Sequence, residues 1–156
     1  EFKNNTQMKK ITLILSLVFF SAIGAFAQLE NPVSWSYAAK KISSTEAIVY
    51  IKANIEDNWY LYSQNIKPGG PNKTVFTFPK SKDYVIVGNT IEPKANSKYE
   101  NVFKMEVAYF KDQVVFQQKI KLNKPSVTVK GSVNFQVCDD KSCLPPTDVA
   151  FSIPVK

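Results

Sequence analysis

The chain has 156 residues, with 20 lysines, no arginine, no histidine and 13 acidic residues, for a formal charge of +7. The lack of histidine excludes Ser-His-Asp and Cys-His catalytic pairs and histidine-ligated zinc, and the lack of arginine argues against nucleic-acid recognition. Because 44% of the residues are hydrophobic and 13% aromatic, the chain can bury one core of ordinary size.

The first segment has the pattern of a secretory signal peptide. Met8-Lys9-Lys10 is a positive start, Ile11 to Gly24 is apolar and uncharged, and Ala25-Phe26-Ala27 is an A-x-A cleavage site. Residues 1–27 are therefore expected to be upstream residues plus a removed signal, with a short transmembrane anchor as the alternative. The mature domain is then residues 28–156, exported to the periplasm without membrane insertion, where a disulfide is chemically permitted. Its mild lysine excess is spread along the whole chain and is expected to form a solvated, lysine-rich surface.

The rest of the sequence alternates apolar and polar residues, which is typical of half-buried β-strands. Turn-forming clusters at 43–44, 67–71, 92–93 and 123–125 separate the strands. The expected strands are Val33–Ile42, Ala47–Ile55, Val75–Phe78, Tyr84–Val87 (ended by Gly88-Asn89), Phe103–Tyr109, Val114–Leu122, Val127–Val137 and Val149–Val155. Such a series predicts a single all-β domain, an immunoglobulin-like β-sandwich, with a jelly roll or small barrel as the alternative.

The two cysteines, Cys138 and Cys143, lie in a polar turn between two expected strands. A ring of about six residues would stabilise the fold by only about 2 kcal/mol, which makes it a weak structural staple. A small ring in an exposed loop is also open to thiol–disulfide exchange, so the spacing leaves a structural and a redox-active disulfide as alternatives. Metal binding is disfavoured, because two sulfur ligands without histidine make a poor site.

Two blocks of sequence carry a family likeness. The first runs from Val137-Cys138 through Cys143-Leu144-Pro145-Pro146 to the terminal strand, and the second is Asp57-Asn58-Trp59-Tyr60-Leu61-Tyr62. Together they resemble the N-terminal periplasmic domain of the DsbD family of thiol:disulfide interchange proteins. The resemblance implies an immunoglobulin-like domain that acts as a protein-disulfide reductase, or thiol:disulfide oxidoreductase, without a cofactor. It also implies thioredoxin-fold partners, namely an electron donor and periplasmic acceptors that include proteins of cytochrome c maturation.

The resemblance implies roles for individual residues. Cys143 matches the cysteine that forms a mixed disulfide with partners, and Cys138 matches the cysteine that resolves it. Tyr60 and Tyr62 match aromatic residues beside the pair, for which ordinary strand packing is the alternative.

A cap loop that shields the disulfide in this family corresponds to Ser97–Phe103. Its candidate residues are Tyr99, Glu100 and Phe103. The corner formed by Pro145 and Pro146 is expected to fix the start of the terminal strand, beside the surface on which a partner docks.

Two features depart from the family pattern. The cysteines are separated by four residues, one fewer than in the best-known members, and the membrane-embedded and thioredoxin domains are missing. We therefore expect a monomeric, stand-alone version, or one whose other domains lie on other chains. A function of another class is a secreted immunoglobulin-like binding module with a structural disulfide, in which exposed Trp35 and Trp59 would form the binding platform.

Overall fold

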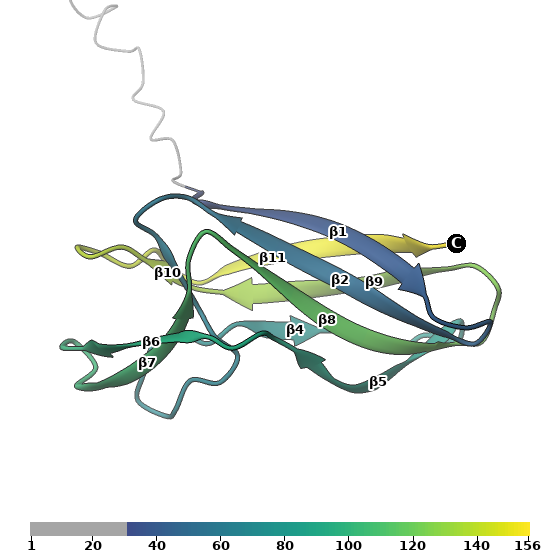
Figure 1. Cartoon of the computed structure of the whole chain (residues 1–156), viewed down its shortest axis with the longest axis horizontal. Coiled ribbons are helices and arrows are strands. Elements are labelled where there is room, and N and C mark those ends of the chain that lie inside the picture. The colour runs from purple at the N-terminus through teal and green to yellow at the C-terminus, as the bar shows by residue number, and fades with distance from the viewer. Residues whose placement is uncertain (1–30) are drawn as a thin grey trace, which may run out of the picture. The chain divides into compact units, whose positions relative to one another are not determined.

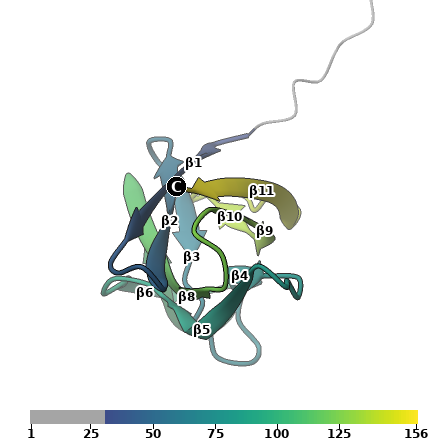
Figure 2. The ribbon, with the colours of Figure 1, turned by 90° about the vertical axis from the view of Figure 1, so that its right-hand side faces the viewer.

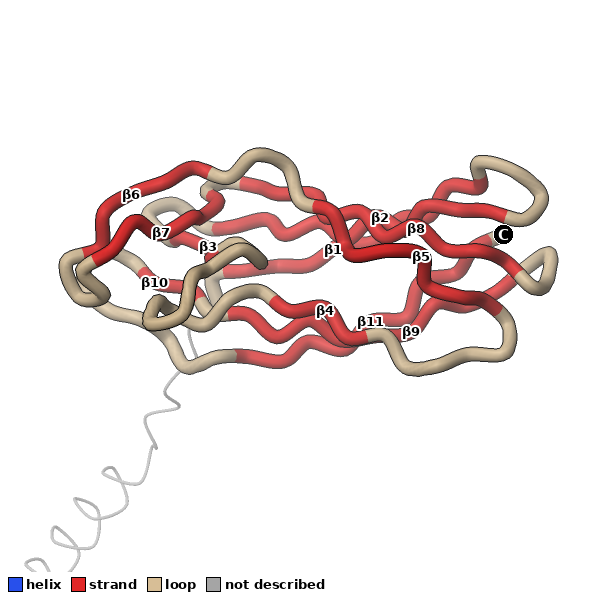
Figure 3. Tube along the Cα trace, turned by 90° about the horizontal axis from the view of Figure 1, so that it is seen from below, coloured by secondary structure: helices blue, strands red, loops and turns tan. Residues whose placement is uncertain are grey.

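The computed structural model describes residues 31–156, which form eleven β-strands and, within that range, no helix (Figure 3). None of these residues belongs to a helix that could cross a membrane. The predicted signal segment, its cleavage site and the start of the mature chain lie outside the described residues. The predicted all-β class is confirmed.

The strands form three antiparallel sheets (Figures 1 and 2). Sheet A contains, in spatial order, β1 (Val33–Lys41), β2 (Glu46–Ile55), β8 (Gln113–Leu122) and β5 (Tyr84–Ile91). Sheet C contains β11 (Thr147–Val155), β9 (Val127–Phe135) and β4 (Val75–Thr77). Sheet B is made of the shorter strands β10 (Val137–Cys138), β3 (Tyr60–Tyr62), β7 (Met105–Phe110) and β6 (Asn96–Glu100).

Sheets A and C enclose the core, and aromatic side chains join them. Trp35 of β1 lies 5.2 Å from the ring of Phe135 on β9 and 6.3 Å from that of Phe116 on β8, measured between ring centres. Trp59 also belongs to the core, at 7% exposure. The expectation that Trp35 and Trp59 form an exposed platform is therefore wrong, because burying rings of this size stabilises the sandwich by about 1.5–3 kcal/mol each.

The alternation predicted for β2 and β8 is confirmed. The inward residues of β2 are fully buried from Ala47 to Ala53, and Phe116 and Ile120 of β8 face them. Pairing in register places every second side chain of both strands on the core face.

The predicted end of β5 at Gly88 is wrong, since the strand continues to Ile91 through an irregularity in its pairing with β8. Gly88 has a φ of 69°, a conformation that favours glycine. The buried side chain of Gln118 donates a hydrogen bond of 3.1 Å to the Val87 carbonyl and accepts one of 2.8 Å from Thr90. These bonds replace ladder contacts that the irregularity removes.

Sheet B extends the sandwich at one end, at the left of Figure 1. β2 leads into β3, β7 into β8, and β9 into β10 through single-residue or short connections. Asn58 and Asp112, which lie in two of these connections, have positive φ values of 70° and 59°. We call this region the cysteine end, because it carries Cys138.

Candidate functional site

A tight turn holds the two cysteines at the cysteine end. Cys138 closes β10, pairs with Tyr60 of β3, and forms a disulfide with Cys143, with the two Cα atoms 4.0 Å apart. Backbone hydrogen bonds flank the ring, from Asp139 to Ser142 at 2.9 Å and from Leu144 to Val137 at 3.0 Å. The ring therefore sits on a small β-hairpin whose geometry does not depend on the sulfur bond alone.

The Asp139 side chain organises the turn. Its carboxylate accepts backbone N–H groups of Ser142 and Lys141, the latter at 2.8 Å. These bonds favour the charged form, so they hold the pKa of Asp139 below its ordinary value, with the Ser142 amide as the largest cause.

The two cysteines differ in exposure. Cys138 is 2% exposed and packs with Tyr62 and Val107, whereas Cys143 is exposed. A reagent arriving from solvent therefore meets Cys143 first, while Cys138 stays covered by sheet B.

A cavity of about 320 Å³ lies beside the disulfide. One wall is the cysteine turn, and the other belongs to β6, Tyr62 of β3, and the turn that follows β6. The lining residues are Tyr62, Lys98, Glu100, Val102, Phe103, Cys138, Asp139, Asp140, Lys141, Ser142 and Cys143. The fold thus brings residues 98–103 opposite residues 138–143, about 40 positions further along the chain.

The segment predicted as a cap loop is a β-hairpin rather than a loop. Asn96–Glu100 is strand β6, paired with β7, and the connecting turn follows it. Glu100 and Phe103 line the cavity, but Tyr99 does not and is 57% exposed. Neighbouring residues of a strand point to opposite faces, which separates Tyr99 from Glu100. Pro145 is exposed and also lies outside the cavity lining.

Tyr60 links the cysteine turn to sheet B. Its hydroxyl donates a hydrogen bond of 2.7 Å to Asp140, and its ring meets that of Tyr109 edge-on, with the centres 5.2 Å apart. The bond to Asp140 is the largest cause that raises the pKa of Tyr60 to about 12, and burial adds to it. Burial is the largest cause that raises the pKa of Tyr62 to about 12. Both predicted tyrosines therefore lie at the site as protonated phenols at neutral pH.

The sequence did not predict the lysines that surround Tyr60. The Lys98 ammonium lies 3.6 Å from the centre of the Tyr60 ring and the Lys111 ammonium lies 4.6 Å from it. Lys98 also lies 2.8 Å from Glu100 and 4.0 Å from Asp140. The Lys98 ammonium thus contacts Glu100 on its own strand, the Tyr60 ring and the cysteine turn. The pair between Lys98 and Asp140 joins the hairpin to the turn. Because the Asp140 side chain is 77% exposed, this pair is worth at most about 1 kcal/mol and holds the hairpin only weakly.

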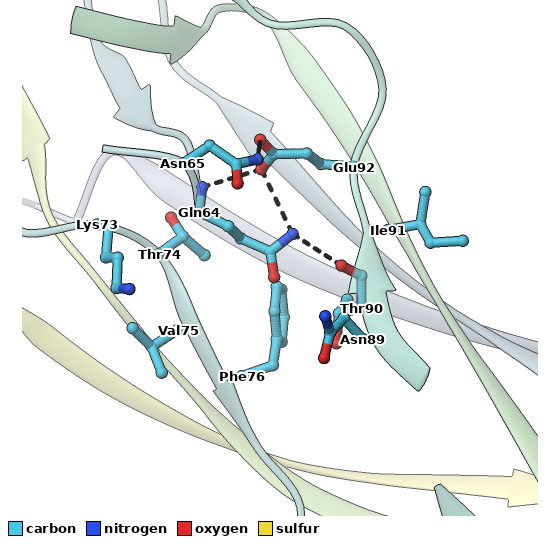
Figure 4. Close-up of a pocket in the computed structure, with 10 residues that line it drawn as sticks. All are labelled: Gln64, Asn65, Lys73, Thr74, Val75, Phe76, Asn89, Thr90, Ile91 and Glu92. Carbon is cyan, nitrogen blue, oxygen red and sulfur yellow. Dashed lines mark hydrogen bonds between the residues drawn. The ribbon is translucent and has the colours of Figure 1, made fainter. Parts of the chain in front are cut away.

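A larger cavity, of about 520 Å³, lies between β4, the segment after β3 and the end of β5 (Figure 4). Its organising group is Glu92, which accepts hydrogen bonds from the Gln64 backbone at 2.9 Å, from the Asn65 side chain at 2.7 Å and from the Ser63 hydroxyl. Figure 4 shows Gln64 and Asn65 converging on Glu92. These bonds to Glu92 fix the chain directly after Tyr62 and so help to hold β3 in place. No cysteine lines this cavity.

Comparisons with solved structures show the same fold. The N-terminal periplasmic domain of ScsB from Proteus mirabilis has a TM-score of 0.60 and 16% identity, over 79% of this chain and 46% of that one. A chain of the complex between the DsbD N-terminal and PilB N-terminal domains from Neisseria meningitidis has a TM-score of 0.53 and 17% identity, over 83% of this chain and 88% of that one. The present chain thus spans about half of the ScsB chain. The predicted immunoglobulin-like β-sandwich is confirmed.

No curated protein sequence matches the chain. A family model does match it, over nearly the whole described domain and through both cysteines. The model, described as thiol:disulfide interchange protein DsbD, N-terminal, covers residues 30–154. With the disulfide-bonded turn at the end of an immunoglobulin-like sandwich, this match shows that the chain belongs to the DsbD N-terminal domain family.

Proposed function

We propose that this domain shuttles electrons in the periplasm, from a thioredoxin-like donor to the disulfides of other thioredoxin-fold proteins, through the Cys138–Cys143 pair. Membership of the family supports thiol–disulfide exchange as the chemistry. The observation that carries the finer proposal is the unequal exposure of the two cysteines. An exposed sulfur can meet a partner, while a covered sulfur next to it can only react within the chain.

In the reducing direction, the Cys143 thiolate attacks one sulfur of the partner's disulfide, and the departing sulfur leaves with the bonding electrons and takes a proton. Cys138, after losing its proton, attacks Cys143 Sγ and breaks the intermolecular bond. The partner leaves with two electrons and two protons more than it brought, and the domain leaves as the disulfide. A thioredoxin-like donor reverses these steps and restores the dithiol.

The proposed encounter surface is the rim of the 320 Å³ cavity. Glu100, Phe103 and the strongly exposed Val102 lie on its β6–β7 side. Lys98 of the hairpin contacts the cysteine turn at Asp140, and this 4.0 Å ion pair with a largely exposed carboxylate is weak. A partner can therefore displace the hairpin at low cost and gain apolar contact with the two side chains at its tip.

The complex between DsbD N-terminal and PilB N-terminal domains supports a protein partner at this kind of domain. For the present chain, the partner class is proposed from the chemistry. A dithiol that carries two electrons needs a partner disulfide that is accessible and easily reduced, and thioredoxin-fold proteins present such a bond.

The test separates the two cysteines. The Cys138→Ser variant, incubated with an oxidised thioredoxin-fold protein, should accumulate a mixed disulfide through Cys143, seen as an adduct in intact-mass spectrometry. Cys143→Ser should form no such adduct, and Ser152→Ala, at an exposed position of β11 outside the cavity lining, should reduce the partner as the unmodified domain does. Equal partner reduction by both cysteine variants and the unmodified domain would overturn the proposed roles.

A measured reduction potential separates the shuttle from a binding module with a structural disulfide. A shuttle requires a potential between those of its donor and its acceptors. A potential below about −300 mV is typical of structural disulfides and would exclude the proposed electron transfer.

A further inference from the structure

The end of the domain opposite the cysteines carries most of the net positive charge of the described residues. Three loops lie there, at 42–45, 78–83 and 123–126, which join β1 to β2, β4 to β5, and β8 to β9. The right-hand end of Figure 1 shows this region, and it faces the viewer in Figure 2. We call these loops, together with the ends of the six strands that they join, the basic pole. Its lysines are Lys40, Lys41, Lys80, Lys82, Lys119, Lys121 and Lys124.

The charge is segregated rather than spread. The pole has seven lysines and only two acidic residues, Glu46 and Asp83, which leaves five positive charges in excess. The remainder of residues 31–156 has ten lysines and nine acidic residues, so it is nearly neutral. Lysines that are spread along the chain are thus combined by the fold into one basic end.

Both carboxylates of the pole are already used. Glu46 lies 2.8 Å from the ammonium of Lys119, and Asp83 lies 2.6 Å from that of Lys124. Within the described residues, the other five lysines of the pole have no carboxylate within 4.0 Å. The Lys41 ammonium donates a hydrogen bond to the Pro125 carbonyl, and the ammonium groups of Lys40, Lys80, Lys82 and Lys121 are available to an external anion.

The three loops are bound to one another, which holds the lysines on one surface. The Leu122 backbone donates to the Thr45 carbonyl at 2.7 Å, and the Asn123 backbone donates to the Asp83 carbonyl at 2.9 Å. The Asn123 side chain donates to the Lys82 carbonyl at 3.0 Å. Binding an anionic surface therefore costs little ordering of the backbone.

From these observations we propose that the basic pole binds the surface of an anionic phospholipid membrane. Lysines on several loops, without arginine, match diffuse attraction to many headgroups better than bidentate recognition of one anion. Ile42, 46% exposed beside Lys41, adds an apolar side chain that can enter the headgroup region. The disulfide lies at the other end, so the cysteines of a membrane-bound domain face away from the lipid (Figure 1).

The test uses the predicted mature domain, residues 28–156, which includes both buried clusters of the described residues. This domain should sediment at low ionic strength with vesicles of equal parts phosphatidylglycerol and phosphatidylcholine, and not with vesicles of phosphatidylcholine alone. Binding should be lost in about 1 M salt, where charges are screened beyond about 3 Å.

Charge reversal locates the surface. Each lysine near an anionic membrane contributes about a fivefold gain in binding, so Lys40→Glu, Lys82→Glu and Lys121→Glu together should weaken partitioning by at least about 100-fold. The matched control reverses three exposed lysines outside the pole, Lys67, Lys73 and Lys94, with the same change in net charge. Circular dichroism melts confirm that both variants are folded.

Three results would overturn the proposal. One is the absence of binding to anionic vesicles at low salt, and another is equal weakening by both triple variants, which would show that only net charge matters. The third is binding of an acidic protein partner at the pole with no lipid binding. Because vesicle binding does not involve the disulfide, each of these results leaves the proposed electron transfer untouched.

Discussion

Reduction of the Cys138–Cys143 bond should leave the domain folded and only slightly less stable. A ring of about six residues restricts the unfolded chain little, so its loss costs about 2 kcal/mol. The backbone bonds that flank the ring, from Asp139 to Ser142 and from Leu144 to Val137, do not involve sulfur and persist. Cys138 keeps its buried position as a thiol, so no cavity forms.

The expected shift follows from the size of the domain. Unfolding a domain of this length carries an entropy of about 0.25 kcal/mol/K, so a loss of about 2 kcal/mol lowers Tm by about 8 °C. Thermal melts by circular dichroism, with and without a thiol reductant, measure this shift. The Cys143→Ser variant is the matched control, because it removes the bond at the exposed cysteine and should melt like the reduced domain.

A much larger effect would refute the reasoning. If reduction unfolds the domain at 25 °C, or lowers Tm by more than twice the expected amount, the bond is a structural staple. A domain that depends on its disulfide for folding cannot cycle through the dithiol state, and the proposed electron transfer would be excluded with it.

Three further substitutions test the structure around the site. Tyr60→Phe removes the hydrogen bond to Asp140 and should destabilise the domain by about 1 kcal/mol in chemical denaturation, because the carboxylate is largely exposed. In the unmodified domain the raised pKa favours the protonated phenol in the folded state. Stability should therefore be constant below about pH 10 and fall as pH rises toward about 12. Ultraviolet titration should show one late-ionising tyrosine fewer in Tyr60→Phe than in the unmodified domain, because Tyr62 still ionises late in the variant. Gln118→Leu leaves the Val87 carbonyl without its side-chain partner and should cost about 1–3 kcal/mol in the same denaturation assay, and an unchanged stability would show that water replaces the amide. Gly131→Ala places a methyl group 2.6 Å from a backbone oxygen of β4, so its Tm should fall by several degrees while its reduction potential stays unchanged, and a normal Tm would contradict the packing of sheet C.

The sequence predicts the long strands because their pattern is strong. β2 and β8 alternate over ten residues each, and such a pattern predicts both the strand and the side of it that is buried. β3 and β6 were missed because neither has such a pattern. β3 is buried at all three positions, and β6 is a polar strand that exists by pairing with β7. Strands of this kind depend on tertiary contacts rather than on their own alternation.

The same distinction holds at the site. The close cysteine pair and its polar turn are visible in the sequence, so Cys138 and Cys143 could be named. The position of Lys98 over Tyr60 depends on the order β10-β3-β7-β6, which the sequence does not reveal. The segregation of charge was missed for a related reason, since lysines that are far apart in sequence meet only when three loops gather at one end.

The connections between sheet B and sheets A and C divide the domain into a part that surrounds the sulfurs and a part that holds most of the core. The chain passes between them at 56–59, 63–74, 92–95, 111–112, 136 and 139–146, and three of these connections contain a residue with positive φ: Asn58, Gly69 and Asp112. Substitutions beyond these points alter the surroundings of the sulfurs, while most of the core residues of sheets A and C keep their neighbours. Variation in partner choice can therefore accumulate in sheet B, and replacing its four strands together by those of another family member is a practical way to exchange one specificity for another.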